Sequence, residues 1–413
     1  MTGRWLVVAL VGMLLLTACN SRQTTVLTPA QVAARARPAT LLIFAKVEVS
    51  GSIPKIGLSS NRLSNDAMMR VGAGASDHEK AEQIITTLLN APGDYLREGE
   101  GSTPVKGELE MLGTGFVVTP DGYILTNAHV VRPDKRELTK EVLERMPDKV
   151  DEDYKAVHDG VEHLLAGETI GNESSQRLRE AFNEQVMKGA DLNANSQVVA
   201  VFSTQGSDGR PDARPCEIKK VGAPIPGKDV AVLKVEGRNL ATLPLAQGVE
   251  SGSVTTGSDL LIMGYPGKVF EDPDITNASK LQPSLTFGHV SGIREMAGGF
   301  HVIQTDATIN HGNSGGPALN DYGQVVGQAT FMEADSQGLN FAIDIGVARE
   351  FLQELHVIPN ASSAFSAPQE SHAPAETYRA TGRQHGRFPV GVIVFLLIVV
   401  VAVVAVAVTV ARN

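Results

Sequence analysis

The chain has 413 residues, of which 42% are hydrophobic and 20% are charged, so it has room for roughly two to three globular domains. The net charge of −10 argues against a phosphate-binding surface, and nucleic acid is therefore not an expected partner. Two cysteines, Cys19 and Cys216, are too few for a disulfide framework or a cysteine zinc site. No metal or other cofactor is expected.

The first 19 residues have the pattern of an export signal. Arg4 is followed by an apolar run from Trp5 to Leu16. A run of about a dozen residues is typical of a signal peptide and too short to span a bilayer comfortably. The sequence LTAC, which ends at Cys19, resembles a bacterial lipobox, in which the cysteine is lipidated after cleavage. An ordinary signal peptide or an uncleaved anchor is the alternative.

The next part of the chain alternates strand and helix patterns. An amphipathic segment at 26–37 precedes an apolar, β-branched strand pattern at 39–50. Residues 51–108 break that pattern and contain one predicted helix, DHEKAEQIITTLLN. A Pro-Asp-Gly turn between two strand patterns then predicts a hairpin over 111–131. A charged, helical segment follows at 133–194, so two helical insertions interrupt the strands.

Strand patterns dominate the remainder of the globular region. They are QVVAVFSTQGSDGRPDARPCEIKKV, DVAVLKV, SDLLIMGYP, LTFGHVSGI, FHVIQTDATI, GQVVGQATF and LNFAIDI. AREFLQELHV has the pattern of a closing helix. Many short strands separated by turn signals predict an all-β barrel or sandwich.

The C-terminal part consists of a linker and an apolar segment. Residues 361–388 are rich in Ala, Ser, Pro and Gln and have no core of their own. Residues 390–411 are almost uniformly apolar, and as a helix they would reach ~33 Å, enough to span a membrane. Three arginines precede this segment and only Arg412 follows it, which opposes an outside-facing domain. We expect the N-terminal export signal to override this bias.

A candidate nucleophile lies in TDATINHGNSGGPALN, residues 305–320. The hydroxyl of Ser314 would need a base to take its proton, and that base must be held in one tautomer. His129, in ILTNAHVV, and Asp229, at the start of DVAVLKV, are the candidate partners. Each residue alone also has a structural interpretation, as a turn serine, a core histidine or a strand-edge aspartate. Their order along the chain, His, Asp, Ser, is that of the chymotrypsin architecture.

TNAHVV, KDVAVLKV and TDATINHGNSGGP followed by LNFAI resemble the trypsin-like serine proteases of the HtrA (Deg) family. SDGRPDARPCEIKKVG resembles the segment before the family's catalytic aspartate. The resemblance covers about 40–355, with two inserts, and implies two antiparallel β-barrels in a protease domain at 38–356. It implies that Ser314 is the nucleophile, His129 the general base and then acid, and Asp229 the orienting carboxylate. The N–H groups of Gly312 and Ser314 would form the oxyanion hole.

The same resemblance indicates where the primary specificity pocket lies. Its base would be Thr308, six residues before the serine, and its walls would include Gly327, Leu339, Asn340 and Phe341. No carboxylate occurs among these residues to offset the desolvation of a lysine or arginine side chain. We therefore expect cleavage after small or medium aliphatic residues.

Two features of the sequence bear on this interpretation. GNSGG also satisfies the G-x-S-x-G pattern of α/β-hydrolases, but Gly315-Gly316-Pro317 is a poor helix start and the later histidines lie in a terminal helix or the linker. His311 is expected to be an ordinary loop side chain. The second feature is a departure from the family, since no PDZ-like region follows the protease pattern, so regulation by PDZ-bound peptides is not implied.

The sequence thus predicts a membrane-tethered serine endopeptidase that acts on protein or peptide substrates. The catalytic domain is expected to face the periplasm or the extracellular side of the cell membrane. The oligomeric state and the natural substrate are left open. The alternative is a catalytically silent binding or chaperone-like protein on the same fold.

Overall fold

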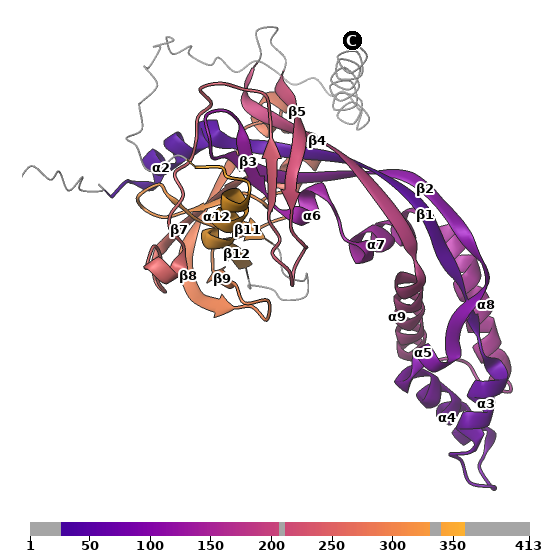
Figure 1. The fold of residues 1–413 in the computed structure, drawn as a ribbon. Coiled ribbons are helices and arrows are strands. Elements are labelled where there is room, and N and C mark those ends of the chain that lie inside the picture. Colours follow the sequence, from indigo (N-terminus) through magenta and orange to yellow (C-terminus); the bar gives the residue numbers. More distant parts are fainter. Residues whose placement is uncertain (1–25, 206–210, 331–339, 360–413) are drawn as a thin grey trace, which may run out of the picture.

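The computed structural model describes residues 26–205, 211–330 and 340–359. The predicted signal peptide with Cys19 and the predicted membrane helix at 390–411 lie outside these ranges. Within them, no helix is both long and apolar enough to cross a membrane. The described residues form two antiparallel β-barrels and an arm of helices that extends from one of them (Figure 1).

Barrel one closes in the order β1-β2-β3-β6-β5-β4. One face of β1 is buried at every second residue from Leu41 to Val49, because successive side chains of a strand point to opposite faces. The strands of this barrel are β1 (Thr40–Leu58), β2 (Leu96–Val117), β3 (Tyr123–Thr126), β4 (Asp191–Gln205), β5 (Pro211–Val221) and β6 (Ala231–Lys234).

Barrel two closes in the order β10-β11-β12-β9-β8-β7. Its closing helix α12 (Ile345–Glu354) reaches back to barrel one, where Lys228 pairs with Glu350 at 2.6 Å. The prediction of two antiparallel barrels is therefore confirmed. The strands of this barrel are β7 (Asp259–Gly264), β8 (Ser284–Glu295), β9 (His301–Thr305), β10 (Pro317–Leu319), β11 (Val325–Thr330) and β12 (Asn340–Asp344).

Short helices complete the barrels. The amphipathic segment at 26–37 forms α2 (Pro29–Ala36), which a capping box between Thr28 and Gln31 begins. The segment between β7 and β8 carries two further helices that the sequence patterns did not single out. The remaining short elements are η1 (Arg37–Ala39), α6 (Ala128–Val131), η2 (Val249–Ser251), α10 (Gly267–Glu271) and α11 (Asn277–Lys280).

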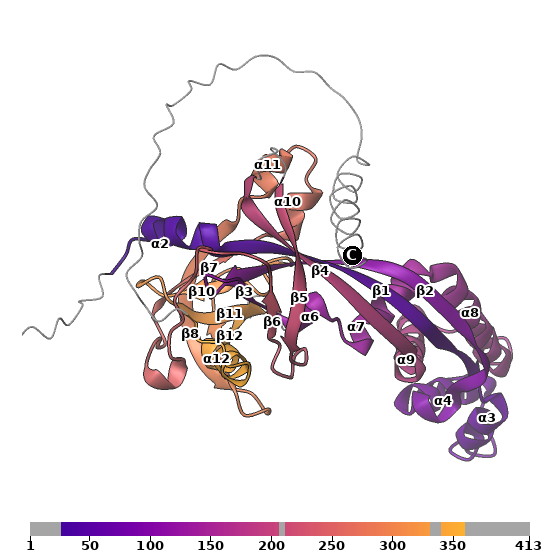
Figure 2. The same ribbon diagram turned by 45° about the horizontal axis from the view of Figure 1, so that its top comes forward.

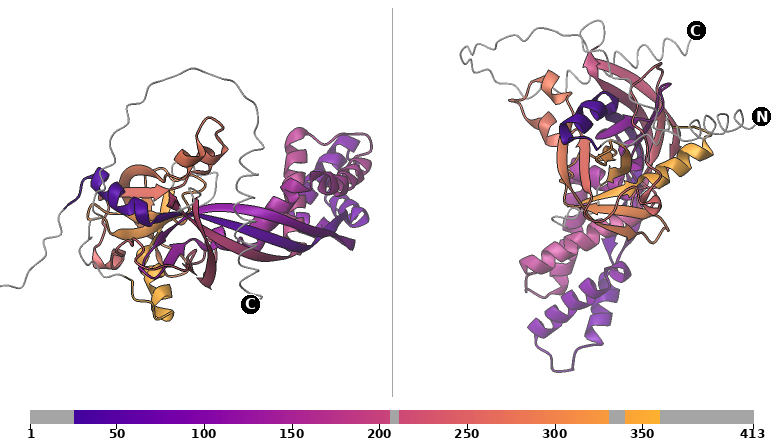
Figure 3. Two further views of the ribbon diagram at one scale, coloured as in Figure 1. Left: turned by 90° about the horizontal axis from the view of Figure 1, so that it is seen from above. Right: turned by 90° about the vertical axis from the view of Figure 1, so that its left-hand side faces the viewer.

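The helical arm consists of the far ends of β1, β2 and β4 together with six helices (Figures 1 and 2). The three strands leave barrel one as a twisted ribbon, and the helices gather along it and at its far end (Figure 3). The first insertion supplies α3 (Ser60–Met68), α4 (Asp77–Asn90) and α5 (Pro92–Tyr95), and the second supplies α7 (Lys135–Arg145), α8 (Pro147–Leu164) and α9 (Asn172–Gly189).

One expectation about the insertions needs correction. The predicted helix DHEKAEQIITTLLN is confirmed as α4, but the strands do not stop near residues 51 and 108, since Gly51 still pairs with Val105 and Leu58 with Leu96. The structure also shows that the two insertions pack together, because side chains of α4 and α9 share one core. Much of this ribbon faces solvent instead of a barrel interior, so its strands contain glycine, proline and charged residues. For this reason they lack the apolar pattern by which strands are predicted.

Candidate active site

His129 and Asp229 lie beside one another because the strands that carry them are paired. His129 is in α6, the single turn that follows β3, and Asp229 lies two residues before β6. Pairing of Thr126 with Ala231 places these two ends together. The Asp229 Oδ2 atom lies 2.7 Å from His129 Nδ1, and Oδ1 accepts the main-chain N–H of His129 at 3.0 Å.

Two further residues hold Asp229, whose side chain is almost fully buried. The hydroxyl of Thr330, at the end of β11, donates to Oδ2 at 2.9 Å. The side-chain amide of Asn127 donates to the main-chain carbonyl of Asp229 at 2.6 Å. Barrel two thus contributes a hydrogen bond to an aspartate of barrel one. Thr330 was missed in the sequence, where the only signal is a polar residue that ends an apolar strand.

The local charges favour an ionised pair. Burial disfavours the charged imidazole of His129, but the charge of Asp229 and the hydrogen bond to it outweigh burial and raise the histidine pKa. The charges of Glu137 and Asp134 also raise the pKa of His129. Burial likewise opposes ionisation of Asp229, yet the charge and hydrogen bonds of His129, with Thr330, lower the pKa of its carboxyl. The site is therefore suited to stabilise an imidazolium.

Ser314 lies in the loop between β9 and β10, and only 4% of its surface is exposed. Its carbonyl accepts the N–H of Thr114, a residue of barrel one, at 2.8 Å. Gly113 lies between the serine and the histidine helix: a Cβ there would be 2.6 Å from the side chain of Val130 and 3.1 Å from the Ser314 carbonyl oxygen. Across the described residues, the Ser314 hydroxyl makes no hydrogen bond.

Gly312 adopts a conformation that only glycine fits. Its φ is +91°, and a Cβ would lie 2.2 Å from the carbonyl oxygen of Tyr265. Glycine at this position therefore has a steric reason that is independent of the expected role of its amide. The chain passes so close to the end of β7 that no side chain can be inserted.

The main-chain amides around Ser314 fall into two groups. Three of them donate to main-chain carbonyls: Asn313 to Asn310, Gly315 to Ala329 and Gly316 to Asn313. The amides of Gly312 and Ser314 have no acceptor within the ranges the structure describes. Two N–H groups that are free to donate, in a buried, glycine-rich loop, are what the stabilisation of an oxyanion would require.

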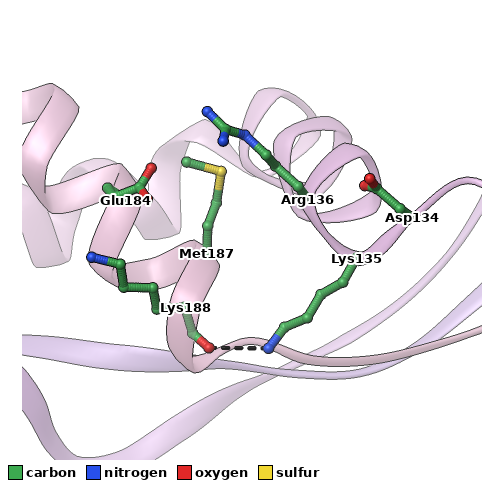
Figure 4. Close-up of a pocket in the computed structure, with 6 residues that line it drawn as sticks. All are labelled: Asp134, Lys135, Arg136, Glu184, Met187 and Lys188. Carbon is green, nitrogen blue, oxygen red and sulfur yellow. Dashed lines mark hydrogen bonds between the residues drawn. The ribbon is translucent and has the colours of Figure 1, made fainter. Parts of the chain in front are cut away.

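The helical arm reaches the segment that follows His129. Asp134 accepts the N–H of Glu137 at 2.7 Å and begins α7. The ammonium of Lys135 donates to the carbonyl of Lys188, at the end of α9, at 3.0 Å (Figure 4). Glu137 is half-buried and its charge acts on His129. The second insertion therefore places a carboxylate near the candidate base.

The predicted specificity residues are only partly placed. Thr308 is exposed, and its carbonyl accepts the hydroxyl of Thr286 at 2.9 Å. Gly327 and Phe341 are buried, and Asn340 is half-buried. Leu339 lies outside the described residues, so the pocket stays a prediction. Nearby, His311 is exposed on the loop.

One group of side chains elsewhere has metal-ligand types. His158, Asp159 and Glu162 on α8 bring their ligand atoms within 4.8 Å of one another. They belong to the helical arm, not to the loop that carries Ser314. Exposed acidic groups of this kind are common without an ion.

Comparison with known proteins places the chain in a family. Residues 113–327 match the model of the trypsin-like peptidase domain, and the chain belongs to that family. Within that family, the chain is similar to DegP-like serine endoproteases of bacteria. It is 28% identical over 263 residues to a probable periplasmic serine endoprotease DegP-like of Pseudomonas savastanoi pv. phaseolicola, which covers 62% of this chain and 37% of the relative.

One further relative and one solved structure are also similar to this chain. The chain is 37% identical over 134 residues to the putative serine protease HhoB of Synechocystis sp., over 31% of this chain and 29% of the relative. The chain thus spans well under half the length of these curated relatives. A solved structure, the HtrA-type protease AlgW with decapeptide, has 20% identity and a TM-score of 0.39 over 80% of this chain and 68% of that chain.

Proposed function

We propose that the protein is a serine endopeptidase in which Ser314, His129 and Asp229 act as a catalytic triad. The observation that carries this proposal is the Asp229 carboxylate, which binds His129 at its main chain and at ring Nδ1. That arrangement leaves Nε2 as the nitrogen available for proton transfer. The membership of the chain in the trypsin-like peptidase family supports the same conclusion.

The proposed reaction has two halves. Ser314 Oγ attacks the peptide carbonyl carbon while His129 Nε2 takes the hydroxyl proton, and the resulting oxyanion binds the N–H groups of Gly312 and Ser314. His129 then gives its proton to the amine that leaves, and an acyl-enzyme remains. Water attacks that ester with His129 as the base, and the acid product and free serine are released. Asp229 orients the imidazole and stabilises its positive charge throughout.

The test is the turnover of casein by the wild-type protein and by Ser314→Ala. We expect the variant to lose about 10⁴–10⁶ in rate, as triad variants typically do. Its melting temperature should be unchanged, because the hydroxyl makes no hydrogen bond among the described residues. A fluorophosphonate probe should label the wild type and not the variant. A wild type that is folded but neither labelled nor active would instead support the silent binding protein.

The substrate class is proposed from the residues assigned to the primary pocket. Because none of Thr308, Gly327, Leu339, Asn340 and Phe341 carries a charge, we expect cleavage after valine, alanine or leucine. A peptide library read by mass spectrometry would test this. Dominant cleavage after lysine or arginine would contradict it.

We further propose that the catalytic domain is held outside the cytoplasmic membrane by both ends of the chain. The support is the lipobox-like LTAC at Cys19, the apolar segment 390–411 and the periplasmic name of the DegP-like relative. A spanning helix anchors more firmly than one acyl chain, so truncation after Pro389 should release the protein most in a Cys19→Ala background. In intact spheroplasts, added protease should digest the catalytic domain. Protection before lysis would place it in the cytoplasm.

A further inference from the structure

Thr114 is a fully buried residue of β2 that binds the loop carrying Ser314 at two points. Its hydroxyl donates to the carbonyl of Gly312 at 2.6 Å and accepts the N–H of Tyr265 at 3.0 Å. Its own N–H donates to the carbonyl of Ser314 at 2.8 Å. One side chain and one amide of barrel one therefore contact three main-chain groups of barrel two.

We propose that Thr114 is a positioning residue that sets the oxyanion hole, an inference that rests on the proposed function. The N–H groups of Gly312 and Ser314 have no acceptor among the described residues, and Thr114 binds the carbonyl of each of these two residues. A peptide unit is planar, so fixing its carbonyl fixes the whole unit. The N–H of Gly312 or Ser314 can then change direction only by rotation of the preceding peptide unit, to which it belongs.

The two amide-bearing peptide units are held in a complementary way. The carbonyl of His311 accepts the N–H of Gly267 at 2.7 Å, and the carbonyl of Asn313 accepts that of Gly316 at 2.9 Å. In a trans peptide the N–H points opposite to the carbonyl, so these bonds turn the amides of Gly312 and Ser314 the other way. Thr114 binds the carbonyls of the other two units, Gly312–Asn313 and Ser314–Gly315. Each of the four successive peptide units between His311 and Gly315 is thus held by a hydrogen bond to its carbonyl.

The hydroxyl is the part of Thr114 that a substitution can isolate. Valine has nearly the same shape but no hydroxyl, so Thr114→Val would leave the Gly312 carbonyl and the Tyr265 amide unpaired in a buried place. The cost of an unpaired buried group favours rotation of the Gly312–Asn313 peptide unit towards another partner. Serine keeps the hydroxyl and loses only a methyl group. Thr114→Ser is therefore the matched control.

A second control separates this role from general stability. The hydroxyl of Thr126 donates to the carbonyl of Thr114 at 2.7 Å, and Thr126 is equally buried. It lies in the same barrel but donates to no carbonyl of the Ser314 loop. Thr126→Val should lower the melting temperature without a selective change in turnover.

The experiment measures kcat and KM on one peptide substrate, with the affinity of a peptide aldehyde and of its product acid. In the aldehyde adduct Ser314 Oγ adds to the aldehyde carbon, the hydroxyl proton passes to His129 Nε2, and the C=O double bond becomes a single bond. The former carbonyl oxygen then occupies the oxyanion hole. For Thr114→Val we expect kcat and aldehyde affinity to fall together by about 10²-fold, the size typical of a lost oxyanion donor. KM and product affinity should stay within about twofold, and Thr114→Ser should stay near the wild type.

Each outcome bears on the proposal. Unchanged kcat and aldehyde affinity in a folded Thr114→Val protein would overturn it, and so would equal losses in aldehyde and product affinity. If the valine variant does not fold, Thr114→Ala is compared with Thr114→Ser by the same two affinities. An inactive wild-type protein would contradict the proposed function itself, whereas an active wild type with an equally active valine variant would contradict only the role of Thr114.

Discussion

The carboxylate of Asp229 binds His129 twice, through the main-chain N–H at 3.0 Å and through ring Nδ1 at 2.7 Å. Two contacts to one residue fix both the position of the backbone and the rotation of the ring. The carboxylate is an acceptor, so it favours the tautomer in which Nδ1 carries the proton. His129 is therefore prepared to take a proton at Nε2.

The pH dependence of activity should reflect this pairing. The proposed base must be neutral, and its pKa is raised, so kcat/KM should increase with pH through a midpoint above the ordinary histidine value of about 6.5. Glu137→Gln removes one of the charges that raise this pKa and should move the midpoint to lower pH. Glu141→Gln, one helical turn further along, should leave it nearly in place. A wild-type midpoint below 6 would contradict the pairing.

Thr330 provides a second test of the Asp229 environment. Thr330→Val removes the hydroxyl that donates to Oδ2 and leaves a buried carboxylate oxygen with one partner fewer. We expect a loss of about 1–3 kcal/mol in the free energy of unfolding and a kcat roughly tenfold lower. Urea unfolding and steady-state kinetics measure the two effects. Thr330→Ser keeps the hydroxyl and should restore both, and a serine variant as impaired as valine would argue against the hydrogen bond.

Gly312 can be tested against a second glycine of the same neighbourhood. In Gly312→Ala the new Cβ would lie 2.2 Å from the Tyr265 carbonyl oxygen at a φ of +91°, so the loop must move. At Gly267 a Cβ would lie 3.5 Å from the His311 carbonyl oxygen, an ordinary contact. We expect Gly312→Ala to lose at least about 10²-fold in kcat, and Gly267→Ala to stay close to the wild type. Similar kinetics for the two variants would count against the assigned oxyanion hole.

Cys216 should be a poor nucleophile in the folded protein. Burial raises the pKa of its thiol to about 12, so very little thiolate exists near neutral pH. In a Cys19→Ala background at pH 8, iodoacetamide should alkylate Cys216 roughly 10³-fold more slowly than an unfolded thiol of pKa about 8.5. Addition of guanidinium should restore the ordinary rate. Fast alkylation of the native protein would show that the thiol is not shielded.

The sequence predicted the parts of this structure that depend on local patterns. Apolar, β-branched patterns predicted the barrel strands, and DHEKAEQIITTLLN was predicted as the helix that the structure has as α4. The structure adds that a capping box between Ser76 and Glu79 begins this helix. His129 and Asp229 were found because each lies at the end of a recognisable strand motif. The pairing of β3 with β6 then brought them together.

Other features depend on pairings between distant segments, which a single sequence does not reveal. The ribbon of the helical arm exists because Gly51 pairs with both Val105 and Leu192, although none of these residues has an unusual local pattern. Thr114 and Thr330 appear as polar interruptions of apolar strands. Their partners lie in the opposite barrel, so their contacts emerged only from the fold.

The long separation between paired strands has a consequence for biosynthesis. Barrel one cannot close until β4 and β6 have emerged, because Leu42 pairs with Val201 and β3 pairs with β6. Ser314, the proposed nucleophile, and Thr330 are made later still, in barrel two. We expect a chain stalled on the ribosome before residue 330 to be inert towards a fluorophosphonate, and a complete chain to react. Translation order would thus keep an incomplete protease from attacking neighbouring nascent chains.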